Sequence, residues 1–185
     1  MTIESAAQQI PTGTWTIDTA HSEVAFSVRH MMVSRVKGRF EKFTATLTVP
    51  EDRSQSTLTA TIDAGSINTD QEQRDEHIRS ADFFDVANHP EFHFEATEIR
   101  PRGEDFSVLG NLTIKGNTRP VELAAEFNGV TQDPWGNDRA GFHATTEISR
   151  KDFGVDIEMP MDGGGVVVGD RIRIEIDVEF TRDQD

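Results

Sequence analysis

The sequence predicts an all-β protein whose strands form one antiparallel eight-stranded barrel with one short inserted helix. Apolar and polar residues alternate in about eight segments, which is the pattern of strands with one buried face. Most of these segments are joined by short, turn-rich connections, and short connections make neighbouring strands antiparallel. Because each segment has one apolar face, the sheet must enclose one interior, and closure into a barrel removes exposed edges. A sandwich of two sheets is the alternative.

The first expected strands lie between the N-terminus and the middle of the chain. They cover residues 14–17, 24–30, 36–49 and 58–64. The step from Phe40 to Phe43 breaks the period of two, so we expect a bulge or bend there. The sequence PEDRSQ, residues 50–55, has the composition of a turn.

The next segment, residues 68–85, lacks this alternation and predicts the inserted helix. Thr69 is followed three residues later by Glu72, which is the spacing of a capping box. Ile78 belongs to a thin apolar stripe. We therefore expect a helix over about residues 70–80 that ends before the two phenylalanines that follow.

The remaining strands follow the helix and continue almost to the C-terminus. They cover residues 92–96, 106–114, 121–127, 142–148 and 172–180. Three turn-rich segments separate them, at residues 101–105, 115–120 and 132–138. A glycine-rich loop, MDGGG, precedes the last strand.

Length and composition limit the class of protein. A chain of 185 residues suits one domain, which we place at residues 13–181 after a flexible N-terminal arm, residues 1–12. The chain has no cysteine, so it has no disulfide or thiolate chemistry. Its acidic net charge of -15 argues against nucleic-acid binding and disfavours anionic membrane surfaces.

Targeting signals are missing from the sequence as given. The N-terminal residues MTIESAAQQIPTG have neither the basic nor the apolar region of a secretory signal peptide. No run of about 18 apolar residues predicts a transmembrane segment. We therefore expect a cytoplasmic protein.

The predicted interior is apolar and rich in phenylalanine. An eight-stranded barrel is either filled by its side chains or leaves room for one small ligand, and periodicity does not distinguish these. A ligand for such a lining would be a lipid-like chain. Burying about ten CH₂ groups at roughly 0.8 kcal/mol each contributes about 8 kcal/mol before the costs of binding, so a long tail is required.

Four sequence motifs resemble the YceI-like family of lipid- or polyisoprenoid-binding proteins. They occur in family order over about residues 13–181, nearly the whole chain. The motifs are DTAHSEVAFSVRHMMVSRVKGRF, RDEHIRSADFFDVANHPEFHFEAT, LGNLTIKGNTRPVEL and VVGDRIRIEIDVE. The resemblance implies a lipocalin-like barrel that holds an isoprenoid or other long-chain amphiphilic lipid, such as a polyprenyl chain or an isoprenoid quinone. It also implies a homodimer.

With this resemblance we expect a hollow barrel whose apolar lining binds the lipid. The predicted lining consists of Phe26, Val28, His30, Met32, Phe40, Ile62, Phe83, Phe84, Phe92, Phe94, Leu112, Ile114 and Phe142. His30 is the polar member and is expected to hydrogen-bond a head group or a neighbouring backbone group. Met31 and Met32 are expected to close one end, because methionine adapts to variable shapes; gap filling is the alternative.

Two arginines beside the predicted helix are further candidates for contact with an anionic head group. Arg74 and Arg79 flank the helix next to the Phe83–Phe84 pair. The alternative is a solvated face on which they pair with Asp75 or Glu76.

Motifs for catalysis, metal binding and nucleotide binding do not meet their geometric requirements. On a strand, Asp18 and Ser22 of DTAHS lie about 13 Å apart and His21 points the other way, so no hydrolase triad is expected unless a turn brings these residues together. His89 and His93 have zinc-like spacing only on a helix, whereas HPEFH predicts a strand. The glycines of GGGVVVG precede a strand, whereas a phosphate loop precedes a helix.

We therefore expect a binding protein without a catalytic residue, metal or cofactor. Two alternatives stay open. One is an enzyme acting on such a lipid with His21 or His30 as acid or base. The other is a filled barrel that acts through its surface or dimer interface.

Overall fold

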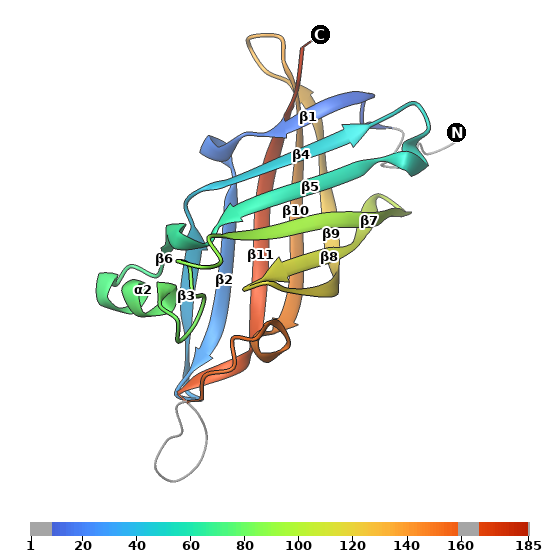
Figure 1. Ribbon diagram of the computed structural model, residues 1–185. Helices are drawn as coiled ribbons and strands as arrows, with labels where there is room; N and C mark the ends of the chain where they lie inside the picture. Colours follow the sequence, from blue (N-terminus) through green and yellow to red (C-terminus); the bar gives the residue numbers. More distant parts are fainter. Residues whose placement is uncertain (1–8, 159–166, 185) are drawn as a thin grey trace.

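Eight strands close into one antiparallel ring in the computed structural model, which describes residues 9–158 and 167–184 (Figure 1). In spatial order the ring consists of β1 (Gly13–Ile17), β4 (Phe43–Val49), β5 (Thr57–Asp63), β7 (Glu91–Arg102), β8 (Asp105–Ile114), β9 (Asn117–Gln132), β10 (Asp138–Ser149) and β11 (Val168–Arg182). The pairing of β1 with β11 closes it. The predicted all-β, eight-stranded, lipocalin-like barrel is thus confirmed.

The edge of β11 pairs with two strands in succession. β1 pairs with its C-terminal part, where Ile17 lies opposite Phe180. The strand β2 (Glu23–His30) pairs with the part before it, between Ile172 and Asp177. The 3₁₀ turn η1 (Thr19–His21) joins the two, so β1 and β2 lie end to end along one neighbour.

The strand β3 (Ser34–Phe40) continues this arrangement. It pairs with β2, while β4, which follows it in sequence, pairs with β1. Glu41 and Lys42 separate β3 from β4, so the bend predicted between Phe40 and Phe43 is confirmed. The short strand β6 (Ile67–Asn68) completes this side of the sheet by pairing with the end of β3.

The inserted helix is α2 (Glu72–Arg79), which lies beside β6 and β3 at one side of the barrel (Figure 1). The helix lies at the predicted position, but the predicted capping box does not form. Thr69 does not cap the helix, because its backbone N–H and its hydroxyl both donate to the carboxylate of Asp75. The N-cap residue is Gln71, which makes no side-chain cap hydrogen bond. Asp70, with φ of 63°, turns the chain between Thr69 and the helix.

Several strands extend beyond their predicted ends. Only Lys115 and Gly116 form the turn expected over residues 115–120, and both have positive φ. Pro120 lies within β9, opposite Asn111 of β8. Residues 117–120 pair with β8 as part of a strand, although their composition is typical of a turn. The glycines of the MDGGG loop lie outside the described residues.

Apolar side chains near the N-terminus belong to the buried core of the barrel. Trp15 on β1 is completely buried, and its indole N–H donates to the carbonyl of Pro11 over 3.1 Å. Ile10 is 5% exposed, and its carbonyl accepts a hydrogen bond from Arg53 over 3.1 Å. Ile10 and Pro11 therefore contact the barrel, although the sequence places them in a flexible arm. The boundary between arm and domain stays a prediction.

Two strand glycines accommodate phenylalanine rings. Phe26 on β2 lies opposite Gly38 on β3, and a Cβ atom at Gly38 would approach the ring to 2.4 Å. A Cβ atom at Gly110 on β8 would likewise approach the ring of Phe94 to 2.5 Å. Glycine weakens a strand unless close approach requires it, and here the ring occupies the position of the missing side chain.

Replacing Gly38 with alanine should therefore destabilise the barrel. We expect Gly38→Ala to lower the free energy of unfolding by about 1–3 kcal/mol, because the added methyl group displaces the Phe26 ring. Urea unfolding followed by tryptophan fluorescence measures this. Gly141→Ala is the matched control, since its Cβ would meet only Asn128 at 3.5 Å. Equal effects of the two substitutions would contradict the packing argument.

Candidate functional site

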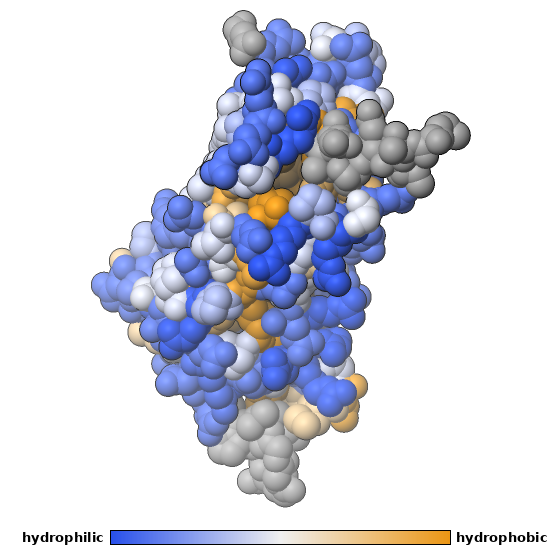
Figure 2. All heavy atoms as spheres, turned by 90° about the vertical axis from the view of Figure 1, so that its right-hand side faces the viewer, coloured by the Kyte–Doolittle hydropathy of each residue, from blue (hydrophilic) through white to orange (hydrophobic). Residues whose placement is uncertain are grey.

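The barrel interior is hollow. The described residues surround a cavity of about 1250 Å³ that is open to the surface, lined mainly by inward-facing side chains of the ring strands and of β2, with further residues from β3 and α2. Ordinary small-molecule pockets occupy roughly 300–1,000 Å³, so this cavity suits a larger ligand. On the face that is the right-hand side of Figure 1, apolar surface is visible between polar side chains (Figure 2).

The predicted lining residues converge on this cavity, with one exception. Those that line it are Phe26, Val28, His30, Phe40, Ile62, Phe83, Phe84, Phe92, Phe94, Leu112, Ile114 and Phe142. Alternation placed most of them correctly because each strand position has only two directions, inward and outward. Whether these side chains bind a ligand stays a prediction.

Met32 is the exception, and the structure corrects its predicted position. Met31 and Met32 lie in the turn between β2 and β3, where their exposed fractions are 42% and 49%. Neither lines the cavity. Both have positive φ, so the strand alternation that would have continued inward from His30 ends at the turn.

Phenylalanine rings build two parts of the cavity wall. Phe40 contacts the rings of Phe26 and Phe92 at centroid distances of 5.6 and 5.5 Å. On another part of the wall, Phe142 contacts Phe127 at 5.4 Å and Phe180 at 6.0 Å. Such tilted and edge-to-face pairs hold one another in place, so the wall does not depend on a ligand to fix these rings.

Of the three polar residues predicted to contact a head group, two line the cavity and one does not. The His30 side chain lines the cavity and makes no hydrogen bond with any part of the chain that the structure describes. Arg74 also lines the cavity, and its guanidinium donates to the hydroxyl and carbonyl oxygens of Thr69 over 2.8 and 2.7 Å. Arg79 is outside the lining, because it donates to the carbonyl of Gly65 over 2.9 Å and to Glu72 over 3.2 Å.

Arg150 is a lining residue that the sequence analysis missed. It is 6% exposed, and its guanidinium donates to the carbonyls of Val155, Ile157, Val168 and Gly169 over 2.7 to 3.2 Å. No described carboxylate forms an ion pair with it, so it is a buried cation satisfied by neutral oxygens. Four acceptors leave one of its five N–H groups without a partner. The alternation of β10, continued by two residues beyond Ile148, would have indicated its inward direction.

His30 and Arg150 lie at the same end of the cavity. Val168 is opposite His30 in the pairing of β2 with β11, and its carbonyl accepts the Arg150 hydrogen bond. A different polar group of lining residues lies near the β4–β5 connection and on β7: Arg53, Ser54, Ser56, Glu98 and Arg100. Arg53 Nε is buried there without a hydrogen-bond partner in the described chain.

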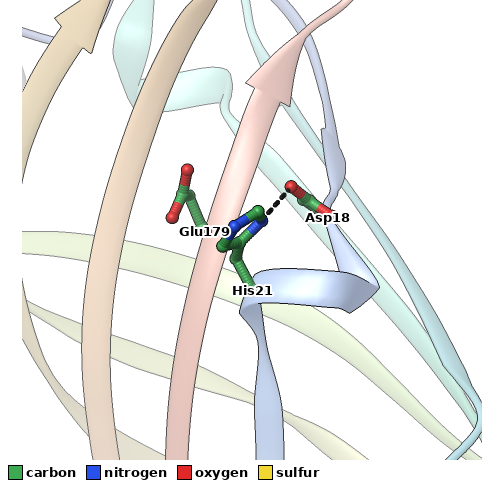
Figure 3. Close-up of side chains that lie close together, drawn as sticks. All are labelled: Asp18, His21 and Glu179. Carbon is green, nitrogen blue, oxygen red and sulfur yellow. Dashed lines mark hydrogen bonds and ion pairs between the residues drawn. The ribbon is translucent and has the colours of Figure 1, made fainter. Parts of the chain in front are cut away.

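The DTAHS motif forms a polar cluster outside the cavity lining (Figure 3). His21 Nδ1 lies 2.7 Å from Asp18 Oδ2, which is the acid–histidine half of a triad. Ser22 does not complete it, because its hydroxyl oxygen accepts a hydrogen bond from the backbone N–H of Glu179 over 3.0 Å. The motif therefore has no serine nucleophile activated by its histidine.

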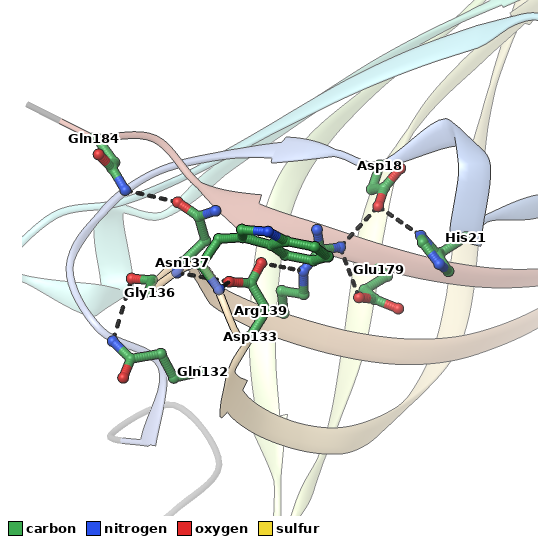
Figure 4. A network of polar contacts seen from close by, with 10 residues as sticks. Asp18, His21, Gln132, Asp133, Gly136, Asn137, Arg139, Glu179 and Gln184 are labelled. Carbon is green, nitrogen blue, oxygen red and sulfur yellow. Dashed lines mark hydrogen bonds and ion pairs between the residues drawn. The ribbon is translucent and has the colours of Figure 1, made fainter.

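The same cluster has donor atoms close enough for a metal, but a guanidinium occupies the position between the carboxylates. Ligand atoms of Asp18, His21 and Glu179 lie within 4.8 Å of one another. Arg139 donates to Asp18 over 2.7 Å and to Glu179 over 2.9 Å (Figure 4). It also donates to Asp133 over 2.8 Å. Arg139 thus supplies the positive charge that a metal would supply.

Arg139 holds two of the carboxylates that it contacts, Asp18 and Asp133, in their charged forms. Its hydrogen bond, followed by that of His21, lowers the pKa of Asp18 to about 2. The hydrogen bond from Arg139 likewise lowers the pKa of Asp133 to about 2. The pKa of Arg139 is raised, first by Asp133 and then by Asp18. These groups are therefore fixed in their charged forms and do not exchange protons near neutral pH.

Comparison with known proteins agrees with this architecture. The YceI-like domain family matches residues 15–180. A UPF0312 protein of Vibrio cholerae is 40% identical over 147 residues, which cover 77% of this chain and 78% of that protein. The crystal structure of Burkholderia cenocepacia BcnA is similar with a TM-score of 0.74 and 24% identity, covering 88% of this chain and 98% of the other.

A further similar structure is that of a polyisoprenoid binding domain from Saccharophagus degradans implicated in plant cell wall breakdown. Its TM-score is 0.66 at 13% identity, and the alignment covers 91% of this chain and 98% of that one. This similarity concerns the fold. In the described residues, no helix combines the length and apolar character needed to cross a bilayer.

Removing the Arg139 charge should change the acid stability of the protein. A carboxylate whose folded pKa is about 2, against an ordinary value of 3.8, stabilises the fold fully above about pH 4. This contribution is lost as the pH falls through 2. We expect Arg139→Gln to lower the urea midpoint at pH 7 and to reduce its further fall between about pH 4 and pH 2. Arg102→Gln, at an exposed arginine, is the control, and parallel pH profiles for both variants would argue against the cluster.

Proposed function

The chain belongs to the YceI-like domain family, and we propose that it binds a long-chain isoprenoid-type lipid inside its barrel. The ligand we propose is a polyprenyl chain or an isoprenoid quinone, held for carriage, storage or sequestration. The polyisoprenoid binding of the Saccharophagus degradans domain, which has the same fold, supports this ligand class.

The hollow apolar interior is the observation that carries the proposal. A cavity of about 1250 Å³ has the volume of roughly 40 water-sized groups, which is enough space for a long hydrocarbon chain. Each buried CH₂ group contributes about 0.8 kcal/mol, so affinity should increase with tail length until the cavity is full. Branched, flexible chains suit a wall built from phenylalanine and aliphatic side chains.

The polar end of the ligand is proposed to lie near His30 and Arg150. The free N–H of Arg150 and the imidazole of His30 offer donors to an oxygen acceptor, such as a quinone carbonyl or a phosphate. An unpaired donor inside an apolar cavity is costly, and a ligand oxygen would remove that cost. Arg74 is a further candidate contact along the same cavity, whereas Arg79 is not.

The two alternatives have less support. A filled barrel is disfavoured by the cavity itself. An enzyme would need an acid or base beside the ligand, but His21, the histidine bound to Asp18, is outside the lining. His30 lies in the lining without a nucleophile or second catalytic group described next to it. The homodimer stays a prediction from the family resemblance.

Native mass spectrometry of the purified protein tests the proposal directly. We expect a discrete added mass, and organic extraction should yield an isoprenoid or another long-chain amphiphile. Protein stripped of lipid should then rebind isoprenoid quinones with affinity that increases with the number of isoprene units. An affinity independent of tail length would reject binding inside the cavity.

Filling the cavity from one strand should reduce binding. Ala60 on β5 faces the cavity, and we expect Ala60→Trp to weaken binding of a long isoprenoid quinone at least about tenfold, because the indole takes the volume of several CH₂ groups worth about 0.8 kcal/mol each. Fluorescence titration of stripped protein measures the dissociation constant. Thr59→Trp adds the same side chain to the exposed face of β5 and is the matched control. Equal affinities for both variants would place the ligand elsewhere.

A further inference from the structure

The turn between β2 and β3 presents an exposed apolar tip, which we define as Met31, Met32 and Val33. Their exposed fractions are 42%, 49% and 88%. In the part of the chain that the structure describes, only Trp135 is a further large apolar residue with such exposure. Three of these four exposed residues thus gather at one point, at the end of a hairpin.

The sequence of the tip does not serve the stability of the turn. Met31 and Met32 have φ values of 50° and 64°, and the backbone N–H of Val33 donates to the carbonyl of His30 over 3.2 Å. A turn with two left-handed central residues favours Asn-Gly. Two methionines are unfavourable there both for backbone conformation and for exposure to water, which indicates another use for their side chains.

Cations flank the apolar tip on the outer face of the hairpin. Arg29 on β2, which also borders the cavity, lies directly opposite Arg35 on β3, and Lys37 follows two residues along β3. All three are exposed, and none forms an ion pair with a described carboxylate. Like charges placed opposite each other destabilise a strand pair, so this arrangement also works against the hairpin itself.

The neighbouring strand presents balanced charge on the same face, so the three unpaired cations of the hairpin are not offset there. On β11, Arg173 lies opposite Ser27 of β2, and Arg171 is nearer the hairpin end. The carboxylates beside them are matched by these cations: Glu175 lies 3.1 Å from Arg173, and Glu147 lies 3.8 Å from Arg171. The hairpin end is therefore locally basic on a protein whose net charge is -15.

We propose that this hairpin docks the protein on an anionic lipid bilayer. The apolar tip enters the interface, and Arg29, Arg35 and Lys37 contact lipid phosphates. Local charge decides this contact, because salt screens charges more than about 8–10 Å away, including most of the acidic surface. The net charge of the whole chain, which argues against such binding, is therefore the wrong measure.

The position of the hairpin connects docking with the cavity. His30, the last residue of β2, lines the cavity, and Met31, the first residue of the tip, follows it directly. Docking through the tip places this end of the cavity against the bilayer. A lipid that enters or leaves there would pass between protein and membrane, a consequence that rests on the proposed lipid binding, whereas docking itself does not.

Vesicle sedimentation tests the docking surface. We expect the full chain to sediment with vesicles of equal parts phosphatidylcholine and phosphatidylglycerol, to bind pure phosphatidylcholine weakly, and to be released by salt. The variant Met31→Asn, Met32→Gly, Val33→Thr keeps a favourable turn and should lose vesicle binding. Trp135→Ser removes exposed apolar surface from the β9–β10 turn, away from the tip, and should bind normally. Circular dichroism confirms that each variant is folded.

The cationic contribution is tested by a second pair of variants. Near an anionic surface each cation changes partitioning about fivefold, so Arg35→Gln with Lys37→Gln should weaken vesicle binding about 25-fold. Arg102→Gln with Arg119→Gln removes two other exposed arginines and should have little effect. Absence of binding to mixed vesicles, or equal losses in test and control variants, would overturn the proposal.

Native mass spectrometry on the same tip variant separates this proposal from lipid binding. Retained lipid together with lost vesicle binding supports docking as a separate function of the hairpin. Vesicle binding by a protein that holds no lipid would leave docking valid and count against the proposed cavity ligand.

Discussion

The hydrogen bonds between β1 and β11 close the barrel. Each strand has one apolar face, and an open sheet of this size would expose that face and two edges. Pairing Trp15, Thr16 and Ile17 with residues 180–182 closes the sheet and converts its apolar face into an interior. The cavity, the aromatic wall and the buried polar groups exist only because this closure encloses them.

The Arg139 cluster stabilises the point at which β2 replaces β1 as the neighbour of β11. Asp18 precedes the 3₁₀ turn at which β1 gives way to β2, Glu179 lies on β11, and Asp133 lies in the β9–β10 connection. One guanidinium therefore links three segments that are far apart in sequence. In the sequence, Asp18 and His21 resemble half of a catalytic triad. In the structure they belong to a polar network that links strands of the barrel, because the surrounding side chains satisfy each other and face away from the cavity.

The hollow interior has a cost that the wall must meet in the absence of ligand. The side chains that line an empty cavity lose van der Waals contacts on that side. Rings such as Phe40 and Phe142 recover part of that loss by packing on neighbouring rings around the cavity. Arg150 illustrates the same compromise for polar groups. It is buried because four backbone carbonyls accept its hydrogen bonds, and the same contacts connect β11 to the segment that follows β10.

The local sequence pattern predicts the class of fold, most strand positions, the bend before Phe43 and most of the inward-facing side chains. It does so because strand alternation is local and allows each residue only two directions. The three-dimensional arrangement of the strands makes the interior hollow, since volume depends on how far apart opposite walls lie. It also determines that Met32 is exposed in a turn, that Asp75 rather than a capping box holds Thr69, and that Arg150 is buried. Each of these depends on where distant strands pair, and no local pattern contains that information.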